Sequence, residues 1–137
     1  MPVFPTSVEW SSRSPHAPAS SSGVATPVRI LAANSGDLGS GIETLILPEL
    51  GSRGNEIEAV NHELARGMAT GRFNILADRI TKLLTLALAD ASVLIVHNVL
   101  TLHQNLGLTA ALARLHAAET LPPVVAWCHD FAWTDPL

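Results

Sequence analysis

The stretch SVLIVHNVLTLHQNLGLTAALARLHAAETLPPVVAWCHD, residues 92–130, decides the fold class. It contains two short aliphatic and β-branched runs, residues 93–96 and 124–127, which are typical of strands buried in a parallel sheet. Between them, leucines recur at helical spacing over residues 104–119 until two prolines end the helix. The order strand, helix, strand predicts a right-handed parallel crossover and hence an open α/β sheet.

The preceding residues extend this pattern toward the N-terminus. Residues 72–91 carry apolar side chains three and four positions apart, which predicts a long helix. A shorter helix is predicted over residues 55–66 with Asn55 as its cap. Two apolar runs, residues 27–33 and 42–47, predict two further strands. The predicted fold class is therefore α/β, with a partial Rossmann-like parallel sheet flanked by helices.

Composition divides the chain into two parts. Residues 1–27 are crowded with serine and proline and show no helical or strand period, which predicts a disordered segment. The remaining residues 28–137 are expected to form one incomplete Rossmann-like domain, because a chain of 137 residues is too short for two full α/β domains.

Charge and hydropathy exclude several classes of function. The formal net charge is −4 and the basic residues are scattered, which argues against binding to nucleic acid. The sequence contains neither a stretch of about 18 apolar residues, the length of a transmembrane segment, nor a secretory signal. Cys128 is the single cysteine, so an internal disulfide is excluded and a cytoplasmic location is expected.

Polar residues follow both strands of the deciding stretch, His97-Asn98 after the first and His129-Asp130 after the second. The carboxyl ends of parallel strands meet at one edge of a sheet, where ligands usually bind. A histidine beside a carboxylate can bind a sugar hydroxyl or move a proton. All four residues could instead only cap loops, since strand ends collect polar residues without any catalytic role.

The remaining candidates are weaker. Trp127 and Trp133 flank the second pair and could wall a sugar site, although aromatic residues near strand ends are more often core or rim. His62, His103 and His116 lack metal-ligand spacing, so no metal site is expected.

Two segments of this region resemble the N-terminal domain of family-4 glycosyltransferases. They are HNVLTLHQNLGLTAALARL, residues 97–115, and PPVVAWCHDFAWTDP, residues 122–136. The segment ILPELGSRGNEIEAVNHELARG, residues 46–67, is similar to the same family, and the resemblance spans residues 28–137. Its specificity lies in the combination of a strand ending in His-Asn, an Ala- and Leu-rich helix, and a strand ending in His-Asp.

The resemblance implies a two-domain GT-B fold and a retaining transfer of sugar from a nucleotide-sugar donor to an acceptor, without a metal or other cofactor. It places His129 at the interdomain cleft beside the reacting sugar, with Asp130 as its neighbour. His97, Asn98 and Trp133 are then candidates for substrate binding. The family pattern also calls for an opening strand with a glycine loop before Val28 and a donor-binding domain after residue 137. The chain is therefore expected to be a truncated, inactive enzyme piece.

Two other functions are compatible with parts of the sequence. The first is a non-catalytic Rossmann-like module that binds a sugar, a nucleotide or a protein. The second is a dinucleotide-dependent oxidoreductase, which is poorly supported because the glycines of residues 36–41 do not match GxGxxG and precede a strand.

Overall fold

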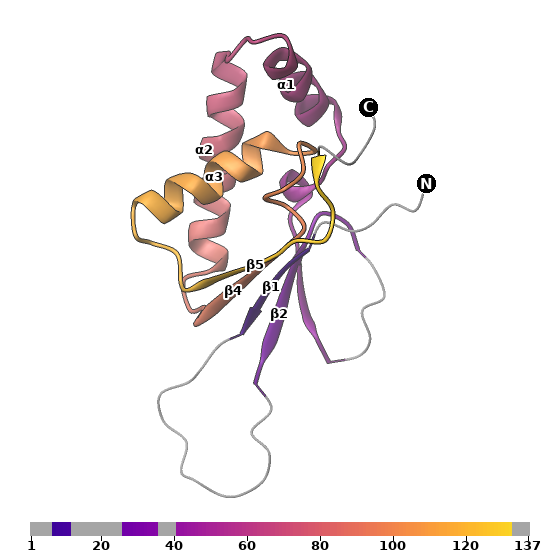
Figure 1. Ribbon diagram of the computed structural model, residues 1–137. Coiled ribbons are helices and arrows are strands. Elements are labelled where there is room, and N and C mark those ends of the chain that lie inside the picture. Colours follow the sequence, from indigo (N-terminus) through magenta and orange to yellow (C-terminus); the bar gives the residue numbers. More distant parts are fainter. Residues whose placement is uncertain (1–6, 12–25, 36–40, 133–137) are drawn as a thin grey trace, which may run out of the picture.

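The computed structural model describes residues 7–11, 26–35 and 41–132, which form an α/β structure with one five-stranded sheet (Figure 1). In chain order the elements are β1 (Ser7–Ser11), β2 (Val28–Ala32), β3 (Glu43–Ile46), the 3-10 helix η1 (Pro48–Leu50), α1 (Asn55–Ala65), α2 (Gly71–Ala87), β4 (Val93–His97), α3 (Leu106–Ala117) and β5 (Val124–Trp127). None of the described helices is long and apolar enough to cross a membrane.

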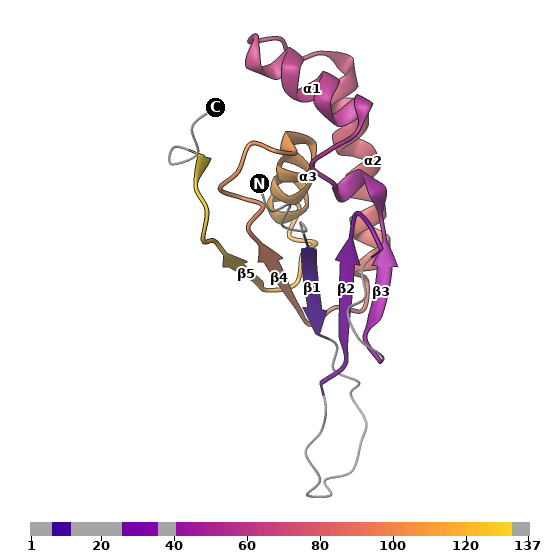
Figure 2. The same ribbon diagram turned by 90° about the vertical axis from the view of Figure 1, so that its right-hand side faces the viewer.

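The strands lie in the order β3-β2-β1-β4-β5 (Figure 2). β2 pairs with β3 in parallel, and β4 pairs with β5 in parallel. β1 lies between these two pairs and runs antiparallel to both of its neighbours. The four strands other than β1 therefore point the same way, and their carboxyl ends share one edge of the sheet.

Two sequence expectations need correction here. The N-terminal segment is not devoid of structure, because Ser7–Ser11 forms the central strand. The sheet is also mixed and not wholly parallel. A five-residue strand among serines and prolines gives a weak local signal, and it forms here because both of its edges find backbone partners, with Val8 opposite Leu31 on one side and Val96 on the other.

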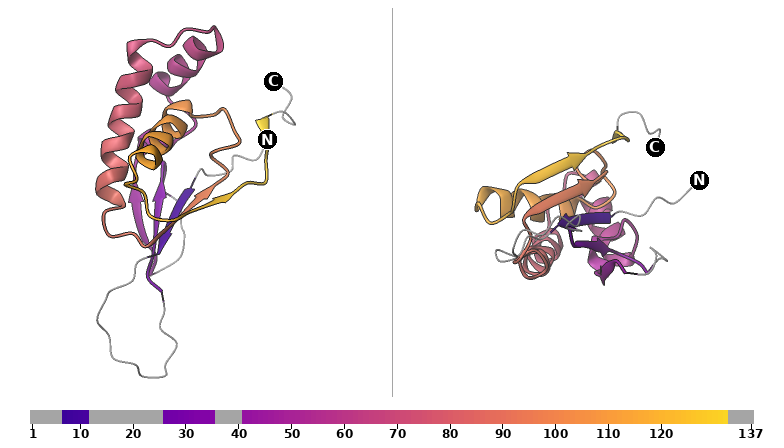
Figure 3. Two further views of the ribbon diagram at one scale, coloured as in Figure 1. Left: turned by 60° about the vertical axis from the view of Figure 1, so that its left-hand side comes forward. Right: turned by 90° about the horizontal axis from the view of Figure 1, so that it is seen from below.

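The helices α2 and α3 pack against the same face of the sheet (Figure 3). The burial of β4 alternates accordingly: Leu94 and Val96 are buried under the helices, while Val93, Ile95 and His97 are half-buried on the opposite face. The largest fully buried side chains form one continuous core: Leu31, Leu50, Val60, Leu76, Ile80, Leu84, Leu94, Val96 and Leu108. Among the described residues no helix covers the second face, so the expectation of helices flanking the sheet holds for one face.

A buried asparagine fixes the start of α3. Asn105 is the N-cap, and its Oδ1 accepts a hydrogen bond of 3.0 Å from the amide of Leu108. Its Nδ2 donates to the carbonyls of Glu49 and Gly51, at 2.9 and 2.7 Å. One side chain therefore satisfies a helix end and ties it to the segment after β3.

An arginine ties the far end of the sheet to α2. The Arg29 guanidinium lies 2.9 Å from Glu43 on β3 and 3.2 Å from Asp90, and it also donates to the carbonyl of Ala87. Its hydrogen bond to Glu43, followed by the interactions with Asp90, raises the pKa of Arg29 above its ordinary value. The charge is therefore retained where α2 ends against β2.

The predicted helices and strands after residue 26 are present, with small differences at their ends. The expectation that residues 124–127 form a buried strand is wrong, because β5 lies at the edge of the sheet and all four of its residues are exposed. Asn55 is the first residue of α1, and Gly54, not Asn55, occupies the cap position with a φ of 135°. α2 ends at Ala87, four residues before the predicted limit. Residues 36–40, which hold most of the glycine-rich segment, lie outside the described residues.

Candidate functional site

The pairing of β4 with β5 brings the two polar pairs together. His97 lies opposite Trp127 in the parallel register, so the residues that follow each strand leave the sheet side by side. The ladder continues one step further, because the amide of Asn98 donates to the carbonyl of Trp127 at 2.7 Å. His97, Asn98, His129 and Asp130 thus form one cluster at the carboxyl edge of the sheet.

Asn98 acts as a clamp between the two strand ends. Its Oδ1 accepts hydrogen bonds from the amides of His129 and Asp130, at 3.4 and 3.0 Å. Its Nδ2 donates to Asp130 Oδ2 at 2.7 Å. The backbone of Asn98 has a φ of 55°, a left-handed conformation that asparagine tolerates better than most residues. Most of its hydrogen-bonding capacity is used inside the protein, which makes it a positioning residue more than a free ligand contact.

Thr101 adds a second tie to the same turn. Its hydroxyl donates to the backbone carbonyl of Asp130 at 2.6 Å, and its own carbonyl accepts from the amide of Ala132 at 2.9 Å. No sequence pattern singles out this residue, because a threonine in the loop after a strand has no distinctive spacing. With Asn98, it fixes the backbone of residues 129–132 against the end of β4.

Three side chains of the cluster form a chain of polar contacts. Asp130 Oδ2 lies 3.1 Å from His129 Nδ1, and His129 Nε2 lies 3.1 Å from His97 Nε2. The His129 and Asp130 side chains are 39% and 50% exposed, so both reach solvent. His97 is half-buried, and its Nδ1 finds no hydrogen-bond partner among the described residues. The cluster therefore offers exposed hydrogen-bond donors and acceptors, on a backbone that Asn98 and Thr101 hold in place.

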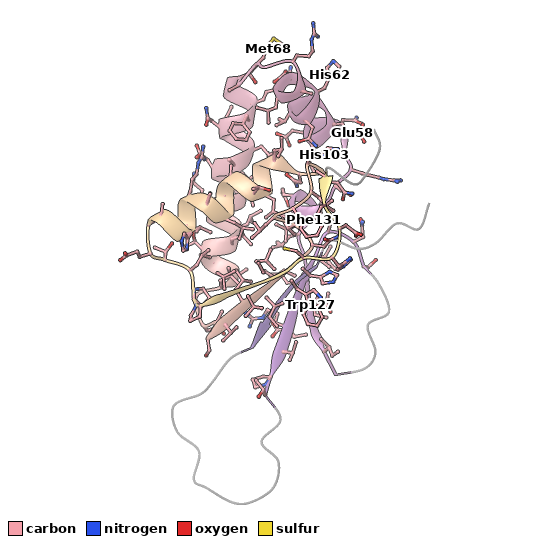
Figure 4. The ribbon with its side chains drawn as sticks, in the orientation of Figure 1. Glu58, His62, Met68, His103, Trp127 and Phe131 are labelled. Carbon is pink, nitrogen blue, oxygen red and sulfur yellow. The ribbon has the colours of Figure 1, made fainter. Side chains whose placement is uncertain are left out.

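An exposed tryptophan borders the cluster on the face of the sheet that carries no described helix. Trp127 is 60% exposed, and its ring centroid lies 6.3 Å from that of His97 (Figure 4). Val125, two residues earlier on the same face, is 49% exposed. Trp133, the aromatic residue predicted to bind substrate, lies outside the described residues.

The other histidines lie elsewhere. His62 is on α1, His103 is in the loop before α3, and His116 is on the last turn of α3 (Figure 4 labels the first two). Among the described residues no three His, Cys, Asp or Glu side chains gather as a metal-binding group. Cys128 is half-buried between Trp127 and His129.

The arrangement suits recognition of a polar, hydroxyl-rich ligand. Imidazole and carboxylate groups supply donors and acceptors at the sheet edge, and the indole supplies an apolar wall beside them. No known family, curated protein or solved structure matches this chain. Function is therefore inferred from this cluster and from the sequence patterns that surround it.

Proposed function

We propose that this chain is the acceptor-side, N-terminal part of a retaining, nucleotide-sugar-dependent family-4 glycosyltransferase, with its partial Rossmann-like sheet as one half of a GT-B fold. The observation that carries the proposal is the joining of His97-Asn98 and His129-Asp130 into one hydrogen-bonded cluster. The resemblance depends on these same two strand ends. Their meeting at the carboxyl edge is the position at which open α/β sheets bind ligands.

In this proposal the exposed side chains of the cluster contact the sugar, and the others hold the backbone in position. His129 and Asp130, both open to solvent, contact the reacting sugar, where an imidazole and a carboxylate can bind hydroxyls and steady developing charge. Asn98 and Thr101 hold their backbone in position. Trp127 offers its exposed indole face to the apolar side of a sugar ring.

Sugar transfer also requires that the donor be held and its leaving phosphate stabilised. In a GT-B enzyme a second, facing domain performs this task. The proposal therefore predicts that the described residues bind the acceptor and that they bind nucleotide sugars weakly or not at all on their own.

The test is a titration of the whole chain, followed by NMR, with a panel of simple glycosides and a panel of free nucleotides and nucleotide sugars. Glycosides should shift the amide signals of residues 128–131, and His129→Gln should abolish those shifts while His62→Gln leaves them unchanged. Micromolar binding of a nucleotide by the chain alone would contradict the acceptor-side assignment. So would glycoside shifts that persist in His129→Gln.

A second candidate function is a non-catalytic binding module, and one feature favours it. An apolar pocket of about 300 Å³ lies between α3 and the β4–β5 pair, lined by Val96, Leu100, Thr109, Leu112, Ala113, His116, Leu121 and Val124. A site of this size and lining accepts small apolar groups. Binding of an apolar fluorescent probe that Leu112→Gln removes and His129→Gln does not would favour this candidate.

A further inference from the structure

The two imidazoles of the cluster approach each other through their Nε2 atoms, but the rings do not lie end to end. The His97 and His129 Nε2 atoms are 3.1 Å apart, the ring centroids are 4.8 Å apart and the ring planes are inclined by 51°. A straight N–H···N hydrogen bond of this length would separate the centroids by about 5.3 Å, because each nitrogen lies about 1.1 Å from its ring centre. The shorter separation means that at least one ring axis is inclined to the line that joins the two Nε2 atoms.

The separation of the two Nε2 atoms is close to that of two ligands of one metal ion. Two nitrogens that each lie about 2.05 Å from one ion are about 3.0 to 3.4 Å apart when the angle between them at the ion is about 95° to 110°, and the Nε2 atoms of His97 and His129 are 3.1 Å apart. Zinc lies about 2.0 to 2.1 Å from imidazole nitrogen in proteins.

Asp130 prepares one of the two nitrogens for this role. Asp130 Oδ2 lies 3.1 Å from His129 Nδ1, and because a carboxylate only accepts hydrogen bonds, this proximity favours the tautomer of a neutral His129 that carries its proton on Nδ1. The lone pair of His129 is then on Nε2, the atom that faces His97. A carboxylate behind a histidine is the usual partner that orients a metal ligand.

We propose that His97 and His129 bind a Zn²⁺ ion through their Nε2 atoms, with Asp130 as the orienting residue. Two neutral nitrogen ligands favour Zn²⁺ and related transition metals over Mg²⁺, which prefers oxygen. The described residues offer no third His, Cys, Asp or Glu ligand, and the side chain of His129 is 39% exposed. The ion would therefore keep positions for water or an oxygen of a ligand, and its affinity would be modest.

The sequence expectation of no metal site rested on spacing along the chain, and these two histidines are 32 residues apart. They meet only because β4 and β5 are neighbours in the sheet. The proposal does not rest on the glycosyltransferase assignment, since it is argued from the contacts among His97, His129 and Asp130.

The test is calorimetric titration of the whole chain with ZnCl₂ in a buffer that does not bind zinc. One site of micromolar affinity is expected, and MgCl₂ should give no binding signal. His97→Gln and His129→Gln should each weaken zinc binding at least ten-fold, and Asp130→Asn should weaken it by about ten-fold. The matched variants His62→Gln and His103→Gln, and Cys128→Ser, should leave the affinity unchanged.

Circular dichroism of each variant separates loss of the site from loss of the fold. A second measurement needs no substitution: on addition of Zn²⁺, the imidazole ¹⁵N resonances of the unaltered chain should shift most at the Nε2 atoms of His97 and His129. Absence of zinc binding would overturn the proposal. Binding that survives both histidine substitutions, or Nε2 resonances that do not move, would overturn it equally.

Discussion

The strands β4 and β5 contribute to two regions built in contrasting ways. Beneath the helices, Leu94 and Val96 are almost completely buried in the apolar core. At the carboxyl edge of the sheet, just after β5, the side chains of His129 and Asp130 reach solvent. Hydrogen bonds to Asn98, at the end of β4, hold this turn in place. Close packing holds the side chains of the first region in position, and hydrogen bonds hold those of the second. Substitutions should therefore be able to change stability and ligand binding independently of each other.

The largest expected effect is a cavity in the packed region. Leu94 is fully buried on β4, so Leu94→Ala should lower the free energy of unfolding by about 3 kcal/mol. The matched control is Leu86→Ala, at a side chain that is 77% exposed on α2, which should change stability by no more than about 0.5 kcal/mol. Urea denaturation of both variants measures the difference. Equal effects would mean that the core is not the layer between α2, α3 and β4.

The next effect is overpacking where α3 meets α2. A Cβ added at Gly107 would lie 2.8 and 2.9 Å from Cδ2 and Cγ of Leu76, a side chain that is only 1% exposed. Gly107→Ala should therefore cost about 2 kcal/mol. Gly71→Ala is the control, because nothing lies within 4 Å of an added Cβ and α2 begins there, so it should stabilise slightly. Thermal unfolding of the two variants should shift in opposite directions, and a destabilised Gly71→Ala would contradict the model of this helix start.

Much of the packed region was predictable from sequence, and the reasons are local. The apolar spacing of α2 and α3 and the aliphatic run of β4 are strong signals, and these elements are found within a few residues of their expected limits. The aliphatic run of β5 also predicts a strand correctly, but its residues are exposed and not buried. The central strand Ser7–Ser11 was not predictable in this way. Its backbone pairs with strands that lie far from it in the sequence, and the local composition of residues 7–11 does not predict such pairing.

The candidate site was predictable in its placement but not in its contacts. Adjacent parallel strands dictate that His97-Asn98 and His129-Asp130 share one edge, and the register confirms that they do. The left-handed backbone of Asn98 and the hydroxyl bond of Thr101 depend on loop conformation, which residue spacing does not specify. The clamp role of Asn98, and the convergence of two imidazoles, could therefore come only from the structure.

A smaller effect should come from the clamp that joins the two regions. Asn98→Gly and Asn98→Ala both remove the hydrogen bonds to His129 and Asp130. Only glycine accepts a φ of 55° without strain, so the alanine variant should be less stable by about 1 kcal/mol. In both variants the amides of His129 and Asp130 should exchange hydrogen faster, as followed by NMR. Unchanged exchange at these two amides would mean that other contacts hold the turn.

The smallest effect on stability should be at the residue with the largest expected effect on binding. The side chain of His129 is 39% exposed, and its polar contacts among the described residues are with the partly exposed side chains of His97 and Asp130, so His129→Gln should change the free energy of unfolding by less than about 0.5 kcal/mol. The same substitution removes the exposed imidazole on which the proposed glycoside binding and the proposed zinc binding both depend. Urea denaturation together with the two titrations tests this separation, with His116→Gln on α3 as a control that should alter neither. A loss of stability comparable with that of Leu94→Ala would place His129 in the structural region, and the contrast between the two regions would then be wrong at this residue.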